Sequence, residues 1–195
     1  MEKLSRNFYN RDTVQVAREL LGQHLVRILP DGTPLVCRIT ETEAYVGPID
    51  KACHAYNYRR TARTETLFAE PGTAHIYLIY GMYHCLNFVT EPEGTPCAVL
   101  IRGAKPIKNA DIISKNRYGC KQDEQTAYQR THFLNGPGKL CQGLCLTRSQ
   151  NGLDLLGQEL FVCSAPAPDV IHAGKRIGID YAEEAADFLW RFWTD

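Results

Sequence analysis

The chain has 195 residues, of which 44% are hydrophobic and 23% charged, and its 22 lysines and arginines balance its 22 aspartates and glutamates. These proportions are typical of a globular domain with a hydrophobic core, and they exclude a disordered tail, a collagen-like repeat and a coiled coil. No apolar run approaches the roughly 18 residues of a membrane-spanning helix, and the N-terminus lacks the apolar segment of a signal peptide. We therefore expect a cytoplasmic protein without a membrane partner.

The first predicted elements are a helix and a hairpin. Asp12 is placed to cap a helix whose apolar residues recur at helical spacing until Gly22. Residues 25–29 and 35–45 are predicted to form strands, because each run is rich in apolar residues and a Pro-Asp-Gly turn separates them. Residues 47–72 show no clean periodicity. They predict a long loop, and long loops in compact domains often carry function.

Short strands and one helix follow. Residues 115–132 are polar and predict an irregular surface excursion, after which the Gly-Pro-Gly-Lys sequence at 136–139 begins a helix. Short strands joined by tight turns favour an antiparallel sheet, so we predict an α+β fold in one domain over residues 1–195. The further strands are predicted at 74–80, 85–90, 97–102, 159–163 and 176–179.

The eight cysteines contain no Cys-x-x-Cys pair, and zinc sites usually show tighter spacing than this chain offers. Most cysteines sit in apolar stretches, which is typical of buried reduced thiols in a cytosolic core. We therefore predict no metal site. Cys141 and Cys145 lie one helical turn apart, a spacing that also allows a metal or redox role.

The strand at 35–45 carries the first candidate site. Side chains alternate faces along a strand, so Glu41, Glu43 and Tyr45 are predicted to share one side with Ile39, which points toward the core. An unpaired buried carboxylate is costly. Two of them on an inward face indicate raised proton affinity and acid–base chemistry. A salt-bridged pair at a sheet edge is the structural alternative.

Two tyrosines further along the chain suggest how a ligand is held. Tyr77 lies inside a predicted strand and Tyr80 at the turn beside Gly81, so they should point in different directions. One can line a pocket while the other projects from the hairpin tip, although both can equally be core or interface filler. Neutral net charge argues mildly against nucleic acid, but arginines cluster at 59–63. Arginines hold phosphates and aromatic rings stack on bases, so the combination indicates a flat aromatic ligand on a phosphate backbone.

These segments resemble the alkyladenine (3-methyladenine) DNA glycosylases of the mammalian type, a family that also occurs in bacteria. The resemblance extends from Phe8 to Phe192, with the motifs in the family's order. It implies a single mixed domain around a curved antiparallel sheet with surrounding helices, not a helix-hairpin-helix architecture. The matching segments are RITETEAYVGPID (38–50), TARTETLF (61–68), IYLIYGMYHCLN (76–87), AVLIRGAKP (98–106), LNGPGKLCQGL (134–144) and RIGI (176–179).

The resemblance implies hydrolysis of the N-glycosidic bond of a damaged purine flipped out of double-stranded DNA, as the first step of base excision repair. The implied substrates are 3-methyladenine, 7-methylguanine, hypoxanthine and ethenoadenine. Glu43 matches the general base that deprotonates a water, and Arg102, beside which Glu43 is expected to stay ionised, helps to hold that water. The backbone carbonyl of Ile177 matches another contact of the water. The segments at 38–50 and 76–87, which carry Glu43 and Tyr77, contain no lysine, so we expect a monofunctional enzyme. We also expect a monomer, and the resemblance implies no cofactor.

The resemblance also assigns binding roles. Tyr45 and Tyr77 match the rings that sandwich the extruded base, and His54 matches a hydrogen-bonding residue beside the base and the sugar phosphate. Asn87 matches a position whose bulk disfavours the exocyclic amino group of normal guanine.

Contacts with the duplex are implied for a further set of residues. Tyr80 matches the tyrosine that fills the gap left by the flipped nucleotide, and Met82 lies on the same hairpin tip. In a bacterium the enzyme would work at the nucleoid. The expected backbone contacts are Arg59, Thr61, Gly138 and Lys139, and Lys51 is expected to be solvated or phosphate-facing.

The sequence departs from the family pattern mainly at its edges, and two other functions remain open. Leu67 stands where the family commonly has methionine, and Glu183, in an acidic stretch, replaces an expected glycine. A nucleoside or glycoside hydrolase could use Glu41 and Glu43 as its carboxylate pair. A nucleic-acid-binding module without catalysis is the other alternative.

Overall fold

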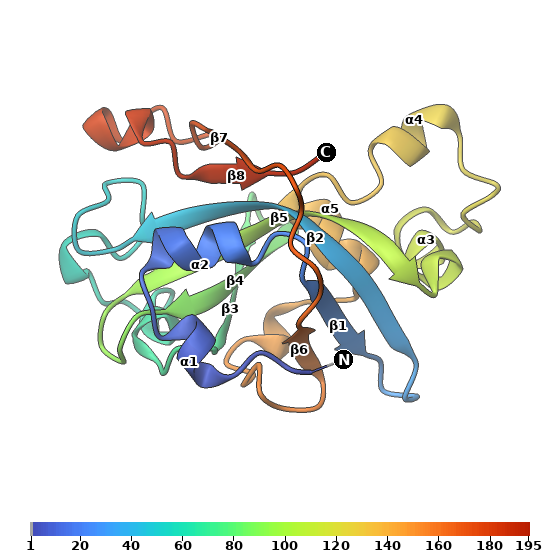
Figure 1. Cartoon of the computed structure of the whole chain (residues 1–195), viewed down its shortest axis with the longest axis horizontal. Helices are drawn as coiled ribbons and strands as arrows, with labels where there is room; N and C mark the ends of the chain where they lie inside the picture. Colours follow the sequence, from blue (N-terminus) through green and yellow to red (C-terminus); the bar gives the residue numbers. More distant parts are fainter. Residues whose placement is uncertain (1) are drawn as a thin grey trace.

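One antiparallel sheet organises the fold (Figure 1). In the computed structural model, which describes residues 2–195, six strands run in the order β3-β4-β5-β2-β1-β6, and β8 pairs with both β2 and β7. The long strands β2 and β5 curve across the molecule, and β7 and β8 lie at one end of it (Figure 1). The strands are β1 (His24–Ile28), β2 (Pro34–Val46), β3 (Ala74–Ile79), β4 (Tyr83–Thr90), β5 (Cys97–Lys108), β6 (Leu160–Cys163), β7 (His172–Gly174) and β8 (Arg191–Trp193).

Short helices surround the sheet. α2 packs against β2 and β5, and α5 packs against β4, β5 and α3. The main core between these elements contains the fully buried side chains of Tyr9, Leu20, Phe88 and Phe192. The helices are α1 (Arg6–Tyr9), α2 (Thr13–Glu19), α3 (Ala110–Tyr118), α4 (Ala127–Thr131) and α5 (Pro137–Gly143), with 3-10 turns η1 (Tyr56–Tyr58), η2 (Glu65–Phe68), η3 (Arg148–Gln150) and η4 (Glu183–Asp187).

The predicted α+β class and antiparallel sheet are confirmed, and the local signals act as expected. Asp12 caps α2 by accepting a hydrogen bond from the Gln15 amide at 2.8 Å. The β1–β2 hairpin forms in antiparallel register, and its turn uses Gly32 at a φ of 84°, a conformation in which glycine is unstrained. Pro137 occupies the first turn of α5.

Two predicted segments are wrong. Within residues 115–132 the chain is helical in two places: α3 ends at Gly119, which adopts the left-handed conformation, and α4 begins with a capping box between Thr126 and Gln129. Residues 176–179 do not form a strand, because Gly178 turns the backbone to a φ of 74° and the buried Arg176 is held by hydrogen bonds outside any sheet ladder.

The expected alternation along β2 is interrupted by a bulge. The register of β2 against β5 shifts on both sides of Glu41, and a bulge adds one residue and moves the following side chains to the opposite face. Ile39 and Ala44 consequently both pack in the main core, and Thr42 donates to the Ala17 carbonyl of α2 at 2.7 Å. The prediction that Ile39 shares the side of Glu43 is therefore wrong, although Glu41 and Glu43 do stay together.

The cysteines do not gather into a site. All eight are free thiols, and six of them are buried. α5 ends at Gly143, so Cys145 lies beyond the helix and is exposed, whereas Cys141 is buried in the core. The expected helical spacing between these two cysteines is thus broken. Among residues 2–195 no three histidine, cysteine or acidic side chains lie together as metal ligands, and no helix is long and apolar enough to cross a membrane.

Candidate active site

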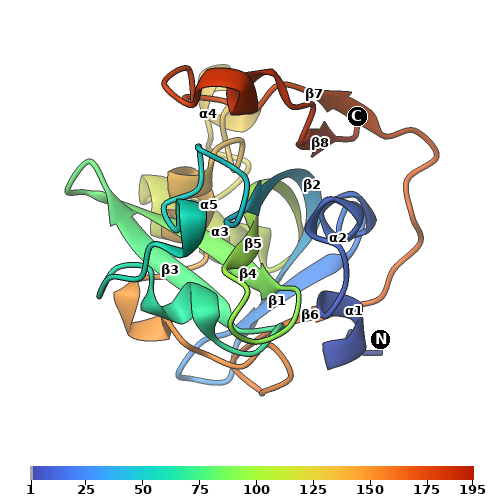
Figure 2. The same cartoon turned by 90° about the vertical axis from the view of Figure 1, so that its left-hand side faces the viewer.

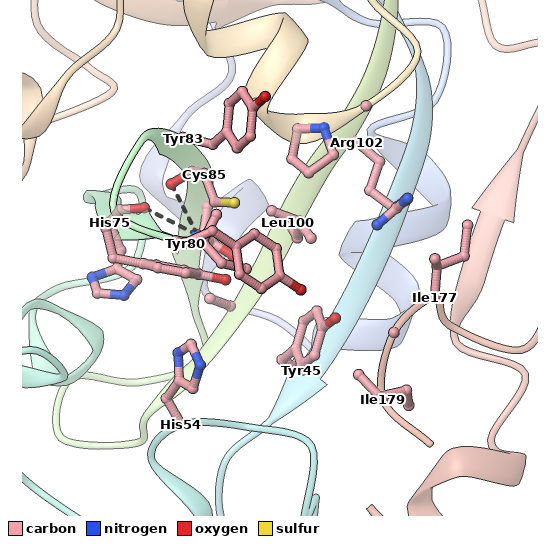
Figure 3. Close-up of a pocket in the computed structure, with 18 of the residues that line it drawn as sticks. Tyr45, His54, His75, Tyr80, Tyr83, Cys85, Leu100, Arg102, Ile177 and Ile179 are labelled. Carbon is pink, nitrogen blue, oxygen red and sulfur yellow. Dashed lines mark hydrogen bonds between the residues drawn. The ribbon is translucent and has the colours of Figure 1, made fainter. Parts of the chain in front are cut away.

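A cavity of about 570 Å³ opens beside the β3–β4 hairpin (Figure 3). Its walls come from the end of β2, the β3–β4 hairpin, the start of α5, residues 52–54 of the long loop and residues 177–181. Figure 2 shows the turn of this hairpin projecting from the side of the molecule. The predicted site residues that line the cavity are Tyr45, His54, Tyr77, Tyr80, Asn87, Arg102, Gly138, Lys139 and Ile177.

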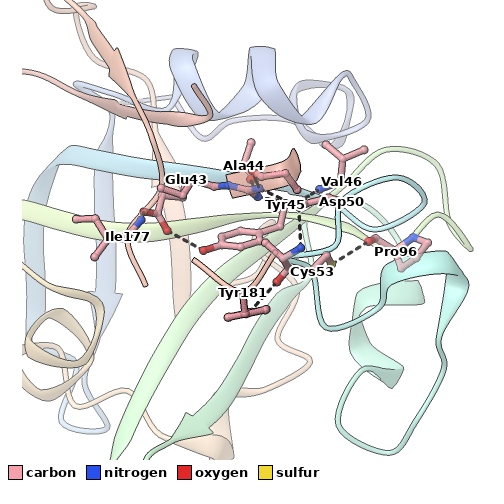
Figure 4. Close-up of polar contacts among 12 residues, drawn as sticks. Glu43, Ala44, Tyr45, Val46, Asp50, Cys53, Pro96, Ile177 and Tyr181 are labelled. Carbon is pink, nitrogen blue, oxygen red and sulfur yellow. Dashed lines mark hydrogen bonds and ion pairs between the residues drawn. The ribbon is translucent and has the colours of Figure 1, made fainter. Parts of the chain in front are cut away.

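Glu43 lies directly behind this lining, with 0% of the residue exposed. Its Oε1 accepts a hydrogen bond from the Ile177 amide at 2.8 Å, and its Oε2 accepts one from the Tyr45 hydroxyl at 2.8 Å (Figure 4). The Arg102 Nε lies 3.5 Å from Oε1. All three partners line the cavity. The carboxylate is thus enclosed at the cavity wall and oriented from both sides.

Burial raises the pKa of the Glu43 carboxyl above its usual value. The Arg102 charge and the hydrogen bonds from the Ile177 amide and the Tyr45 hydroxyl lower that pKa without outweighing burial, and the Glu41 charge adds to the rise. Arg102 thus favours the ionised form of Glu43, as expected, whereas burial opposes it. A raised pKa makes an ionised Glu43 a stronger base than an exposed carboxylate.

The raised pKa of Glu43 predicts an opposite pH dependence of activity and of stability. As pH rises through this pKa, the buried carboxylate ionises at a cost in folding free energy, while the base becomes competent. Near neutral pH, Glu43→Gln should therefore melt at a higher temperature than the parent, and the difference should shrink toward about pH 4, the usual carboxyl range. Melting followed by circular dichroism across pH checks this. A Gln variant that loses more stability at neutral than at acidic pH would contradict it.

Glu41 sits in a network of arginines. Its Oε1 accepts from the Arg102 Nε at 3.1 Å and from the Arg191 Nη1 at 3.3 Å. This carboxylate is part of a salt-bridged group, as the structural alternative supposed, and it holds the guanidinium of Arg102 beside Glu43.

Tyr45 and Tyr77 each have an arginine over the ring. The Arg176 guanidinium lies 4.7 Å from the ring centre of Tyr45, and that of Arg63 lies 5.0 Å from the ring centre of Tyr77. Neither arginine lines the cavity, so they contact the rings from outside it. His54 meets Tyr77 edge to face at 5.0 Å. Both rings are thus fixed in orientation by their surroundings.

The hairpin tip presents the most exposed aromatic ring of the site. Tyr80 is 82% exposed and Met82 is 66% exposed. Tyr80 has a φ of 52° and Gly81 a φ of 69°, and this tight turn directs the Tyr80 side chain outward. Tyr80 also lines the mouth of the cavity, as Figure 3 shows, whereas Tyr77 is half-buried inside β3. Both tyrosines line the cavity and they differ in exposure; that they point in different directions stays a prediction.

Asn87 and His75 are buried beside the cavity, and His54 lies at its wall with more of its side chain exposed. The Asn87 Nδ2 donates to the His75 carbonyl at 3.2 Å and to the Cys85 carbonyl at 3.4 Å (Figure 3). Burial, together with the charge of Arg63, lowers the pKa of His54, and burial with the neighbouring His54 and Arg63 lowers that of His75 to about 4. Both imidazoles are therefore neutral at physiological pH.

The residues expected at the DNA backbone are spread over the rim. Lys139 donates to the Asn135 Oδ1 at 2.8 Å, and Gly138 lies so close to Tyr83 that an added Cβ would stand 3.0 Å from its side chain. Arg59 lines a smaller neighbouring cavity of about 280 Å³ with His54. Thr61 is bonded within its own turn to Thr64 and stands apart from both cavities.

The acidic C-terminal stretch is partly neutralised by Lys51. Its Nζ lies 2.6 Å from Glu183 and 2.9 Å from Glu184, so the expectation of a solvated or phosphate-facing Lys51 is wrong. Glu183 has a φ of 50°, in the region that favours glycine. This explains why a glycine was expected at this position.

The sequence reasoning missed one buried ion pair. Arg176 and Asp50 have side chains that are 0% exposed and contact each other. They lie 126 positions apart in the chain, so no local spacing links them. Both residues belong to motifs of the family resemblance. The one available signal was a charged residue next to apolar residues in such a motif, which can indicate a buried charge.

Comparisons with known proteins identify the family of the chain. The family model described as methylpurine-DNA glycosylase (MPG) matches residues 7–195. Proteins named "Putative 3-methyladenine DNA glycosylase" are similar over most of their length: one from Clostridium perfringens strain SM101 is 50% identical, covering 98% of this chain and 95% of that protein. One from Methanocella arvoryzae is 49% identical, covering 99% and 92% respectively.

An antiparallel sheet with an aromatic cavity and an enclosed carboxylate, in a chain with these relatives, defines a DNA glycosylase, a hydrolase of DNA repair. The chain belongs to the methylpurine-DNA glycosylase family. The predicted family and the predicted enzyme class, a DNA-3-methyladenine glycosylase, are confirmed.

Proposed function

We propose that the protein flips a damaged purine out of duplex DNA, holds it between Tyr45 and Tyr77, and hydrolyses its bond to deoxyribose. One observation carries this proposal: the Glu43 carboxylate is enclosed behind an aromatic cavity, with both oxygens bonded to residues of its lining. A protein that only binds nucleic acid gains nothing from a buried acid near phosphates. The position of Glu43 therefore favours catalysis over the binding-module alternative.

The chemistry requires a water between Glu43 and the sugar. The bond from C1′ to the base nitrogen breaks and its electron pair leaves with the purine, while positive charge grows on the sugar ring. Ionised Glu43 stabilises this charge and takes a proton from the water, whose oxygen then bonds to C1′. Arg102 and the Ile177 carbonyl hold the water in this proposal. The products are a free purine and an abasic site.

The substrates are proposed to be 3-methyladenine, 7-methylguanine, hypoxanthine and ethenoadenine. The first is supported by the names of the relatives. Alkylation at N3 or N7 makes the purine cationic and a better leaving group, so chemistry supplies part of the selectivity. Within residues 2–195 no aspartate or glutamate side chain lines the cavity, whereas Arg102, Arg117 and Lys139 do. This lining suits the negative DNA backbone.

Hydrolysis without strand cleavage is proposed as well. A glycosylase that also cuts the strand forms a Schiff base through an amine. Lys139 is the lysine that lines the cavity in residues 2–195; burial, together with the charge of Arg117, lowers its pKa. Its Nζ is bonded to Asn135 on the rim, and the contacts of Glu43 within residues 2–195 are to the Tyr45 hydroxyl, the Ile177 amide and Arg102, not to a lysine. We therefore assign Lys139 to phosphate contact.

Base release from a panel of duplexes tests the proposal. Purified protein is incubated with duplexes that each carry one damaged purine, and with hypoxanthine as a free nucleoside. The expected result is release from duplexes and none from the nucleoside, leaving strands that break only after alkali. Release from the nucleoside alone would favour the alternative of a nucleoside hydrolase with Glu41 and Glu43 as paired carboxylates.

Asn87→Ser is expected to relax discrimination against undamaged guanine. The Asn87 side chain is 4% exposed and reaches two carbonyls beside the base pocket. A smaller side chain leaves room for the exocyclic amino group of guanine, and pocket differences of this size change selectivity by about 10-fold or more. Release of guanine and of hypoxanthine from matched duplexes gives the ratio. An unchanged ratio would remove Asn87 from the specificity determinants.

A further inference from the structure

The buried pair of Arg176 and Asp50 links three segments around the site. The Arg176 Nη1 donates to the Ala44 carbonyl at 2.8 Å, and its Nη2 donates to the Asp50 Oδ1 at 2.8 Å and to the Ala185 carbonyl at 3.1 Å. One side chain therefore joins β2, the loop that follows β2, and the C-terminal segment. Neither Arg176 nor Asp50 lines the cavity, so neither is expected to touch the substrate.

Asp50 also fixes the turn at the end of β2. Its Oδ1 accepts from the Ala52 amide at 2.9 Å, and its Oδ2 lies 3.4 Å from the Val46 amide (Figure 4). Ala52 lines the cavity. The Asp50 carboxylate is thus bonded to two backbone amides as well as to Arg176. These bonds together fix its orientation.

Arg176 lies next to both groups that donate to Glu43. Ile177, the following residue, supplies the amide that bonds to Oε1 at 2.8 Å. Tyr45, whose hydroxyl bonds to Oε2 at 2.8 Å, has its ring 4.7 Å below the guanidinium. The backbone carbonyl that Arg176 holds belongs to Ala44, between Glu43 and Tyr45.

We propose that Arg176, held by Asp50, is a positioning residue that aligns the Ile177 amide and the Tyr45 hydroxyl on the carboxylate of Glu43. This inference rests on the proposed function, in which Glu43 is the general base. A purely structural ion pair would stabilise the fold without affecting the base. A positioning pair sets the direction of the Glu43 carboxylate, and misplacement of a reacting group by about 1 Å is worth about 100-fold in rate.

The charged and titratable groups around Glu43 come from several elements, so the effect of Arg176 must be separated from theirs. Burial and these neighbours together set the pKa of Glu43. Loss of the two aligned donors, and of the Arg176 charge, would raise that pKa further and move the acidic limb of the pH–rate profile to higher pH. The surrounding groups are Glu41 and Tyr45 on β2, Cys85 on β4, Arg102 on β5, Arg191 on β8, and Arg176.

The test compares Arg176→Gln and Asp50→Asn with the parent in single-turnover base release from a lesion-containing duplex. We expect each variant to be slower by about 100-fold and to bind the same duplex within about twofold. Arg176→Gln, which also removes the charge, should show the acidic limb at higher pH. Arg27→Gln is the matched control, because Arg27 is 3% exposed and pairs with Glu159 at 2.6 Å away from the cavity. It should lose stability and keep the parental rate and acidic limb.

Arg176→Lys keeps the positive charge but loses the paired Nη donors of the guanidinium. This variant replaces Arg176→Gln in the test if Arg176→Gln does not fold. We expect a smaller loss of rate, about 10-fold, with the acidic limb moved in the same direction. Folded Arg176 variants with the parental rate and limb would overturn the inference, as would an equal shift in Arg27→Gln. Failure of the proposed function would look different: Glu43→Gln would then release bases at the parental rate.

Discussion

Glu43→Gln is expected to release a damaged purine from duplex DNA about 10²–10⁴-fold more slowly than the parent, with unchanged affinity for the duplex. The amide keeps the size of the carboxylate and can still accept a hydrogen bond from the Ile177 amide. It cannot take a proton from water or balance positive charge on the sugar. Single-turnover release, with duplex binding measured separately, distinguishes loss of chemistry from loss of binding.

Glu41→Gln is the matched control on the same strand, two residues away. Glu41 bonds to Arg102 and Arg191, so its neutral variant should lose rate through a less well-held Arg102, by much less than Glu43→Gln. If Glu41→Gln were the inactive variant and Glu43→Gln retained the parental rate, the general base would be misassigned. The paired-carboxylate mechanism would instead require both variants to be inactive.

Tyr80→Ala should weaken capture of the flipped nucleotide. Tyr80 is 82% exposed on the hairpin tip beside the cavity, where a ring can enter the gap in the duplex. Stacking of a base on an aromatic ring contributes about 1–3 kcal/mol, which corresponds to about 5- to 150-fold in the affinity for a lesion-containing duplex. Fluorescence of a base analogue beside the lesion reports the flipped population.

Tyr128→Ala controls for the loss of an exposed tyrosine. Tyr128 is 72% exposed on α4 and does not line either cavity. We expect it to leave flipping and base release unchanged. Equal effects of the two substitutions, or parental activity of Tyr80→Ala on a lesion in duplex DNA, would contradict the wedge role of Tyr80.

The parts of the fold that the sequence predicted have local causes. Asp12 caps α2 by bonding to an amide three residues away, and Gly32 closes a hairpin whose strands are adjacent in the chain. The parts that were wrong depend on contacts between distant residues. Arg176 pairs with a residue 126 positions away, so nothing near 176–179 indicates that the segment is held outside the sheet.

The sequence predicted many of the residues that line the candidate site, but it did not predict their arrangement. Tyr45 and Tyr77 line one cavity as expected, because both lie on motifs that the resemblance identified. The bulge near Glu41 could not be foreseen, since it arises from the pairing of β2 with β5. Enclosure of Glu43 also depends on the packing of Ile177 against it, and the burial that results raises the carboxyl pKa although the Ile177 amide itself lowers it.

The uneven distribution of charge reconciles the zero net charge of the chain with its membership of a DNA-repair family. The chain has zero formal net charge, yet Arg102, Arg117 and Lys139 line the cavity. Glu183 and Glu184 form ion pairs with Lys51, and Glu65 forms one with Arg60. Weak non-specific binding to undamaged DNA is expected from the neutral net charge.

Base release in the presence of borohydride tests most directly whether water, and not an amine of the protein, displaces the purine from the sugar. The account predicts a free purine, a strand that breaks only after alkali, and no trapped protein–DNA adduct. A trapped adduct, for example through Lys139, would contradict it.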